Sequence, residues 1–217
     1  PEARVTRDLG DVHPEGNPHY WLDPLNGRLV AAAIAERLSA VYPEHRAEIA
    51  ANLARFEHDL DARMFGAKLV DRFGGEALWR AETSGRLDAL LRAKGAAGDL
   101  GGWRARLAPH RGATVVTYHR SWSYLADRFG LKADLQLEPK PGIPPTAAHL
   151  AELVTAMKAR GAKVLLQEPF YPRRAADWVA ERTGAKVIVV PLMTGGSSAA
   201  EDYLATIENA VAALEGA

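Results

Sequence analysis

Residues 113–119 read ATVVTYH, and this stretch decides the fold class. Its apolar, β-branched run predicts a short buried strand that ends at His119. SWSYLADRFG at 121–130 then has the pattern of a helix, and LKADLQLE at 131–138 that of a second strand. A strand, a helix and a second strand in this order are typical of a parallel sheet, whose neighbouring strands need a crossover connection.

The same alternation continues to the end of the chain. TAAHLAELVTAMKARG predicts a helix with Thr146 as its N-cap, and KVLLQ predicts a third strand. PRRAADWVAERTG predicts a helix, AKVIVV a fourth strand, and residues 199–215 a last helix. Four strands alternating with four helices predict an α/β lobe over residues 108–217, with a parallel sheet covered on both faces.

The part before this lobe is predicted to be helical. Asp23-Pro24 is a helix start, because aspartate can accept from the first free amides and proline suits the first helical position. The helix that it opens should end before Pro43. A second, longer helix beginning near Glu44 carries one apolar stripe, formed by Ile49, Leu53, Phe56 and Leu60.

Residues 66–102 have a weaker pattern, with short helical pieces separated by glycine pairs. We interpret them as a helical insertion. The predicted fold is therefore α/β: a C-terminal parallel-sheet lobe is joined by a long helix to a mostly helical remainder of an N-terminal lobe. The predicted segments are the N-terminal remainder at 1–43, the linking helix with the insertion at 44–107, and the α/β lobe at 108–217.

Composition excludes several kinds of function. Lys plus Arg and Asp plus Glu both number 27 in the 217 residues, and a balanced surface without a basic block argues against nucleic acid as a partner. Cysteine is absent, so a metal site would have to use imidazole and carboxylate. The chain begins at Pro1 without a targeting segment, and we expect an upstream portion in the natural protein.

Polar side chains follow three of the four predicted strands. His119, Glu138 and Glu168 each stand where a strand ends, whereas the fourth strand ends at the apolar Val190. Because ligands collect at the carboxyl ends of parallel strands, we expect the imidazole and the two carboxylates at one edge. A single glutamate in such a place is more often a cap or half of an ion pair. The convergence of three groups favours a binding site.

GNPHYWLDP at residues 16–24 places one more histidine, His19, on the loop that enters a helix. An isolated histidine is more often packed than ligating, so a metal site here needs partners elsewhere in the chain. The sequence contains no His-Glu-x-x-His helix and no Gly-x-Ser-x-Gly elbow, which excludes two common hydrolase sites.

Three motifs carry a resemblance to a known family. GNPHYWLDP, TYHRSWSYLADRFGL and EPFYPRRAADWVAERTGAKVIVV occur in the order found in solute-binding proteins of bacterial zinc and manganese ABC importers. The similarity covers roughly residues 16–60 and 108–215. It implies two α/β lobes, a long rigid helix and a metal held in the cleft between the lobes. His19 and His119 fall on ligand positions of that family.

Two departures from the family pattern affect the ligand set. The family histidine early in the N-terminal lobe has no counterpart here, and Val190 stands where an aspartate is usual. Glu168 or Glu138 could supply the lost carboxylate. We prefer Glu168, since its strand should neighbour the last one. The predicted metal ligands are therefore His19, His119 and Glu168, and His13 is a less favoured addition.

The resemblance implies a transport receptor and not an enzyme. It would bind zinc, or manganese as second choice, outside the cytoplasm and deliver it to an ABC permease. We expect a monomer in the periplasm or outside the cell, with a lipoprotein anchor as an option. Two alternatives stay open: a zinc-dependent hydrolase that uses the same histidines with Glu168 as base, and a relative that no longer binds metal.

Overall fold

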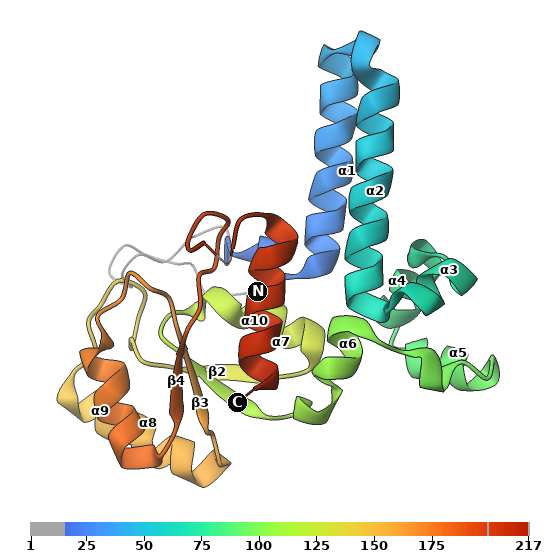
Figure 1. The fold of residues 1–217 in the computed structure, drawn as a ribbon. Coiled ribbons are helices and arrows are strands. Elements are labelled where there is room, and N and C mark those ends of the chain that lie inside the picture. The colour runs from blue at the N-terminus through green and yellow to red at the C-terminus, as the bar shows by residue number, and fades with distance from the viewer. Residues whose placement is uncertain (1–15, 199, 217) are drawn as a thin grey trace. The chain divides into compact units, whose positions relative to one another are not determined.

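The computed structural model describes residues 16–198 and 200–216, and it confirms the predicted fold class (Figure 1). The chain forms two compact units. One is helical and contains Asp23–Pro109. The other contains Pro1–Leu22 together with His110–Ala217 and holds the sheet. The division of the chain into segments 1–43, 44–107 and 108–217 stays a prediction.

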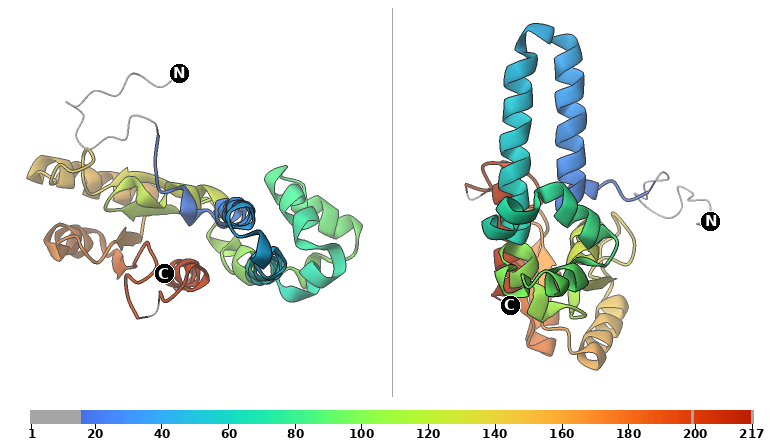
Figure 2. Two further views of the ribbon diagram at one scale, coloured as in Figure 1. Left: turned by 90° about the horizontal axis from the view of Figure 1, so that it is seen from above. Right: turned by 90° about the vertical axis from the view of Figure 1, so that its right-hand side faces the viewer.

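The helical unit begins with a hairpin of two long helices, α1 (Pro24–Val41) and α2 (Arg46–Phe65), which run side by side in Figures 1 and 2. The Asp23 side chain caps α1 by accepting from the Leu25 amide at 3.0 Å, as the sequence predicts. The apolar stripe of α2 becomes more buried toward its C-terminal end, where Leu60 is fully buried. Four shorter helices follow: α3 (Ala67–Phe73), α4 (Gly75–Thr83), α5 (Leu87–Ala93) and α6 (Gly102–Arg106).

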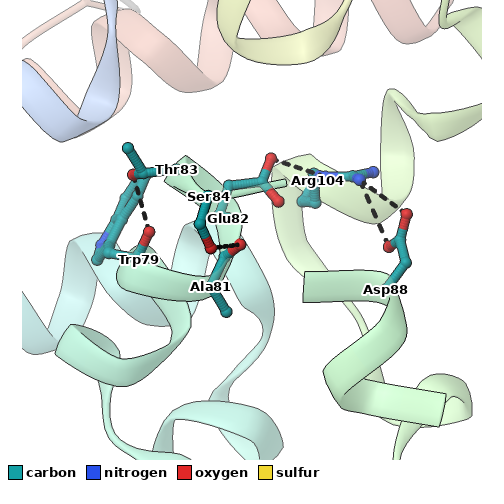
Figure 3. Close-up of polar contacts among 7 residues, drawn as sticks. All are labelled: Trp79, Ala81, Glu82, Thr83, Ser84, Asp88 and Arg104. Carbon is teal, nitrogen blue, oxygen red and sulfur yellow. Dashed lines mark hydrogen bonds and ion pairs between the residues drawn. The ribbon is translucent and has the colours of Figure 1, made fainter. Parts of the chain in front are cut away.

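Buried contacts hold these short helices to α2 and to one another. Gly102 adopts a φ of +60°, and a Cβ there would lie 2.2 Å from the Arg63 carbonyl oxygen, so only glycine allows α6 to approach α2 this closely. The buried guanidinium of Arg104 on α6 contacts Glu82 at the end of α4 and Asp88 on α5 (Figure 3). The stretch between residues 66 and 102 is therefore helical, as predicted.

The α/β unit contains one sheet of four parallel strands in the order β2-β1-β3-β4. The strands are β1 (Thr114–Thr117), β2 (Lys132–Gln136), β3 (Val164–Gln167) and β4 (Lys186–Val189). Helices alternate with them: α7 (Ser123–Phe129), α8 (Ala147–Arg160), α9 (Arg173–Thr183) and α10 (Tyr203–Glu215). This is the predicted alternation, and Thr146 caps α8 as expected by accepting from the His149 amide at 3.2 Å.

The strand order explains the burial of each strand. The central strands β1 and β3 are almost entirely buried, whereas β2 and β4 at the edges are partly exposed. Val116 and Leu165 pair across β1 and β3 and pack against α8 and α9. Figure 1 shows α10 on the opposite side of β3 and β4. Helices thus cover both faces, and the polar groups of the unit collect at the strand ends.

A candidate metal site at the carboxyl edge of the sheet

The three strand-end residues singled out in the sequence lie at the carboxyl edge of one parallel sheet. His119, Glu138 and Glu168 follow β1, β2 and β3, which are neighbours in the sheet. Since the histidine strand is flanked by the two glutamate strands, a carboxylate comes from either side. Sequence order alone did not give this arrangement, because β1 lies between β2 and β3.

The two histidines lie close together. The ring centres of His19 and His119 are 5.3 Å apart, and their planes make an angle of 68°. Both residues belong to the α/β unit. The proximity expected of two ligands of one ion is therefore present, but within one compact unit, whereas the resemblance implies a metal held in a cleft between two lobes.

Hydrogen bonds from four side chains hold the segment that carries His19. Asn17 Nδ2 donates to the Arg120 carbonyl oxygen at 2.9 Å, and the Tyr124 hydroxyl donates to the Asn17 carbonyl oxygen at 3.1 Å. Beyond His19, in the short helix η2 (Tyr20–Leu22), the Trp21 indole donates to the Leu192 carbonyl oxygen at 3.0 Å. The Tyr203 hydroxyl donates to the Trp21 carbonyl oxygen at 2.8 Å.

The Asn17 side chain also contacts His19 directly. Its Oδ1 atom accepts from the His19 amide at 3.0 Å and lies 2.7 Å from His19 Nδ1. Sequence analysis missed this residue. The signal that could have found it is the Asn-Pro pair before the histidine, because an asparagine side chain often accepts from an amide two residues on.

His119 has a carboxylate partner on its Nδ1 atom. Glu138 Oε1 contacts this nitrogen, and Glu138 Oε2 accepts from the Gly142 amide at 3.2 Å. Glu138 is only 6% exposed. Both of its oxygens are thus engaged within the protein. This contact pattern is that of a carboxylate orienting an imidazole, which leaves the other ring nitrogen for a different partner.

Glu168 is in a different situation, since it is fully buried and neither carboxylate oxygen reaches hydrogen-bonding geometry with a described residue. Burial raises the pKa of this carboxyl group. The nearby Ser121, the Glu168 backbone, His119 and Trp122 favour the charged form and lower the pKa by less. Burial also raises the pKa of Tyr118, and the charges of Glu138 and Glu168 raise it further.

The described residues do not complete a metal shell. Within 16–198 and 200–216, no three His, Asp or Glu side chains converge so that they could hold an ion. Val190, at the end of β4, is apolar and buried, and its amide donates to the Gln167 carbonyl oxygen at 2.9 Å. His13 lies outside the described residues.

Most of the chain is similar to a known protein family. The chain matches the protein family described as "ZnuA: Zinc-uptake complex component A periplasmic" over residues 3–64 and 101–217. The chain belongs to this family. The resemblance inferred from the three motifs is therefore confirmed. Residues 65–100 fall outside the match, and their interpretation as an insertion stays a prediction.

Individual relatives of the chain also have names that refer to zinc. The chain is 28% identical to the "High-affinity zinc uptake system protein ZnuA" of Brucella abortus over 172 residues, which cover 79% of the chain and 41% of the relative. It is 25% identical over 207 residues to the "Zinc-binding lipoprotein AdcA" of Streptococcus pneumoniae, covering 94% of the chain and 34% of that protein. The chain thus spans about two fifths or less of the length of these relatives.

A solved structure shares the fold. The "Crystal structure of ZnuA" aligns with a TM-score of 0.67 at 20% identity, and the match covers 93% of this chain and 62% of that one. The family is described as a periplasmic component of zinc uptake, which supports a location outside the cytoplasm. In the part of the chain that is described, every helix is too short or too polar to cross a membrane.

Proposed function

We propose that the chain forms the metal-binding α/β part of an extracytoplasmic receptor for a divalent transition metal ion. Zinc is the first candidate and manganese the second. His19 and His119 are the proposed imidazole ligands, and the receptor would deliver its ion to an ABC permease. We propose that it acts as a monomer in the periplasm or outside the cell, with lipoprotein anchoring as an option.

The observation that carries this proposal is the imidazole pair. Two imidazoles bound through nitrogen at about 2.0–2.1 Å to one tetrahedral ion have ring centres roughly 5 Å apart. The ring centres of His19 and His119 lie 5.3 Å apart, so they have a spacing that one ion could bridge. Each Nδ1 atom already contacts an oxygen, of Asn17 and of Glu138. That arrangement favours Nε2 as the ligating atom.

Glu168 is the proposed carboxylate ligand. Among the described residues, its oxygens have no partner in hydrogen-bonding geometry, whereas both oxygens of Glu138 are engaged. The buried Glu168 would have to move toward the imidazole pair to reach an ion, since the described side chains do not yet converge. Imidazole nitrogen with carboxylate oxygen is a donor set that suits zinc and also accepts manganese.

Isothermal titration with zinc and with manganese tests the proposal. His19→Ala and His119→Ala should each weaken zinc binding at least 10- to 100-fold, the range typical for the loss of a group that merely orients a ligand. His58→Ala, at an exposed imidazole of α2, is the matched control and should bind as the parent does. Binding should also weaken in acidic solution, because a protonated imidazole cannot ligate.

The outcomes separate the competing functions. Unchanged zinc affinity in both histidine variants would refute the assignment of the site. Absence of binding in the parent chain would favour the relative that no longer binds metal. The hydrolase alternative has no supporting observation, and family membership favours transport. Delivery is tested by uptake of radioactive zinc into cells that make the full-length protein with His119→Ala, where uptake should be lost.

A further inference from the structure

We propose that Asn17 is a positioning residue that sets which ring nitrogen of His19 is offered to the ion and ties the His19 segment to the His119 segment. The inference rests on the proposed function, because it assigns the two imidazoles as ligands. Two sets of contacts support it. One joins Asn17 Oδ1 to His19, and the other joins Asn17 to Arg120 and Tyr124.

The orientation of the Asn17 amide follows from its contacts. One end of the side chain lies 3.0 Å from the His19 amide N–H, which can only donate, so the atom there must be the acceptor Oδ1. The other end lies 2.9 Å from the Arg120 carbonyl oxygen, which can only accept, so the atom there must be the donor Nδ2. Both contacts require the same orientation.

This orientation determines the tautomer of His19. Oδ1 of Asn17 lies 2.7 Å from His19 Nδ1, and an amide oxygen can only accept a hydrogen bond. Nδ1 must therefore carry the hydrogen. In a neutral imidazole the lone pair then lies on Nε2, which is the nitrogen that can bind a metal. Asn17 thus orients His19 through its Nδ1 atom, as Glu138 orients His119, but Asn17 carries no charge.

The second set of contacts connects the two histidine segments. Asn17 Nδ2 donates to the carbonyl oxygen of Arg120, the residue that follows His119. The Asn17 carbonyl oxygen accepts from the Tyr124 hydroxyl on α7 at 3.1 Å. One residue therefore fixes the tautomer of one histidine and restrains the distance to the other.

Three variants of the full chain separate these roles. Asn17→Ala removes both ends of the amide. Asn17→Asp keeps an oxygen that can accept from Nδ1 but loses the donor to Arg120. Asn52→Ala is the matched control, since Asn52 is an exposed asparagine of α2 that contacts Arg55 and belongs to the other unit.

The first readout is the tautomer of His19 in metal-free protein, measured by long-range proton–nitrogen NMR of the ring. At about pH 8.5 an ordinary imidazole is neutral, so only tautomers are compared. The parent, Asn17→Asp and Asn52→Ala should show Nδ1–H alone. Asn17→Ala should show a mixture with Nε2–H. If Asn17→Ala keeps Nδ1–H alone, the proposal is overturned, and this holds whether or not the chain binds zinc.

The second readout is zinc affinity by titration with the metal alone. Asn17→Ala should bind zinc 10- to 100-fold more weakly, the usual effect of losing a partner that orients a ligand. Asn17→Asp should also bind more weakly, because the tie to Arg120 is lost. Parent-like affinity in both variants would overturn the positioning role. Failure of the parent itself to bind zinc would refute the proposed function and leave the tautomer result to decide this one.

Discussion

The hydroxyl of Tyr203 donates a hydrogen bond to the carbonyl oxygen of Trp21 at 2.8 Å, although the two residues are far apart in the chain. Trp21 in turn donates through its indole to Leu192, so α10 and the loop before it both hold the short segment that carries His19. The position of His19 thus depends on the C-terminal end of the chain.

Tyr203→Phe should loosen this segment without unfolding the unit. Loss of one hydrogen bond costs about 0.5–1.5 kcal/mol. The amide hydrogens of residues 16–22, apart from Pro18, which has none, should then exchange with solvent roughly two- to tenfold faster, because their local opening becomes easier. Hydrogen exchange measures this directly. Tyr42→Phe, at an exposed tyrosine of the helical unit, should change nothing in this segment, and equal exchange in the parent and Tyr203→Phe would contradict the prediction.

Glu138→Ala should weaken zinc binding although Glu138 need not touch the ion. The variant removes the oxygen that contacts His119 Nδ1, so the imidazole loses its fixed orientation. A 10- to 100-fold loss of affinity is expected. Glu152→Ala, at an exposed glutamate of α8, is the control in the same titration. Parent-like affinity in Glu138→Ala would show that His119 is positioned by other contacts.

Glu168→Gln should change the way in which the stability of the protein depends on pH. Burial raises the pKa of Glu168, so this group favours the folded state when protonated, and that contribution is lost as the pH rises through the raised pKa. Glutamine stays neutral at every pH. The free energy of unfolding of Glu168→Gln should therefore exceed that of the parent by an amount that increases as the pH rises above about 4.5, with a slope of at most about 1.4 kcal/mol per pH unit.

Urea unfolding of the parent and Glu168→Gln at several pH values measures this difference, with Glu152→Gln as the control. A constant difference between parent and variant would mean that the raised pKa does not contribute to stability. Zinc titration of the same protein tests the ligand role, because a glutamine amide is a poor substitute for a carboxylate ligand. Weaker zinc binding is expected if Glu168 completes the site.

Arg104→Leu should destabilise the helical unit strongly. Arg104 is 6% exposed and contacts Glu82 at 3.0 Å and Asp88 at 3.5 Å (Figure 3). Its removal leaves the Glu82 carboxylate, whose side chain is only 9% exposed, unpaired, which costs up to about 3–5 kcal/mol. Arg80→Leu breaks an exposed pair with Glu76 and should cost no more than about 1 kcal/mol. Denaturant unfolding distinguishes the two, and equal midpoints would be inconsistent with this account.

The sequence predicted the alternating strands, their parallel arrangement and the proximity of His19 to His119. These features follow from local patterns and from the family motifs. The sequence favoured Glu168 over Glu138 as a ligand only slightly, from its expected place beside the last strand, since both residues follow strands in the same way. Only the three-dimensional structure places Glu138 against His119 and keeps the Glu168 oxygens out of hydrogen-bonding geometry with the described residues. Asn17 was missed because its contact with Arg120 joins segments far apart in the chain.

The central position of β1 has a consequence for charge. Its neighbours β2 and β3 end at Glu138 and Glu168, so the histidine at its own end lies between two acidic groups. When both carboxylates are ionised and both imidazoles are neutral, the four groups carry a total charge of −2, which equals in magnitude the charge of a divalent ion. An ion taken up at this edge would form an electroneutral assembly and would need no accompanying anion from solution. A monovalent ion would leave one of these negative charges uncompensated, so two ionised carboxylates at the proposed site would favour a divalent ion.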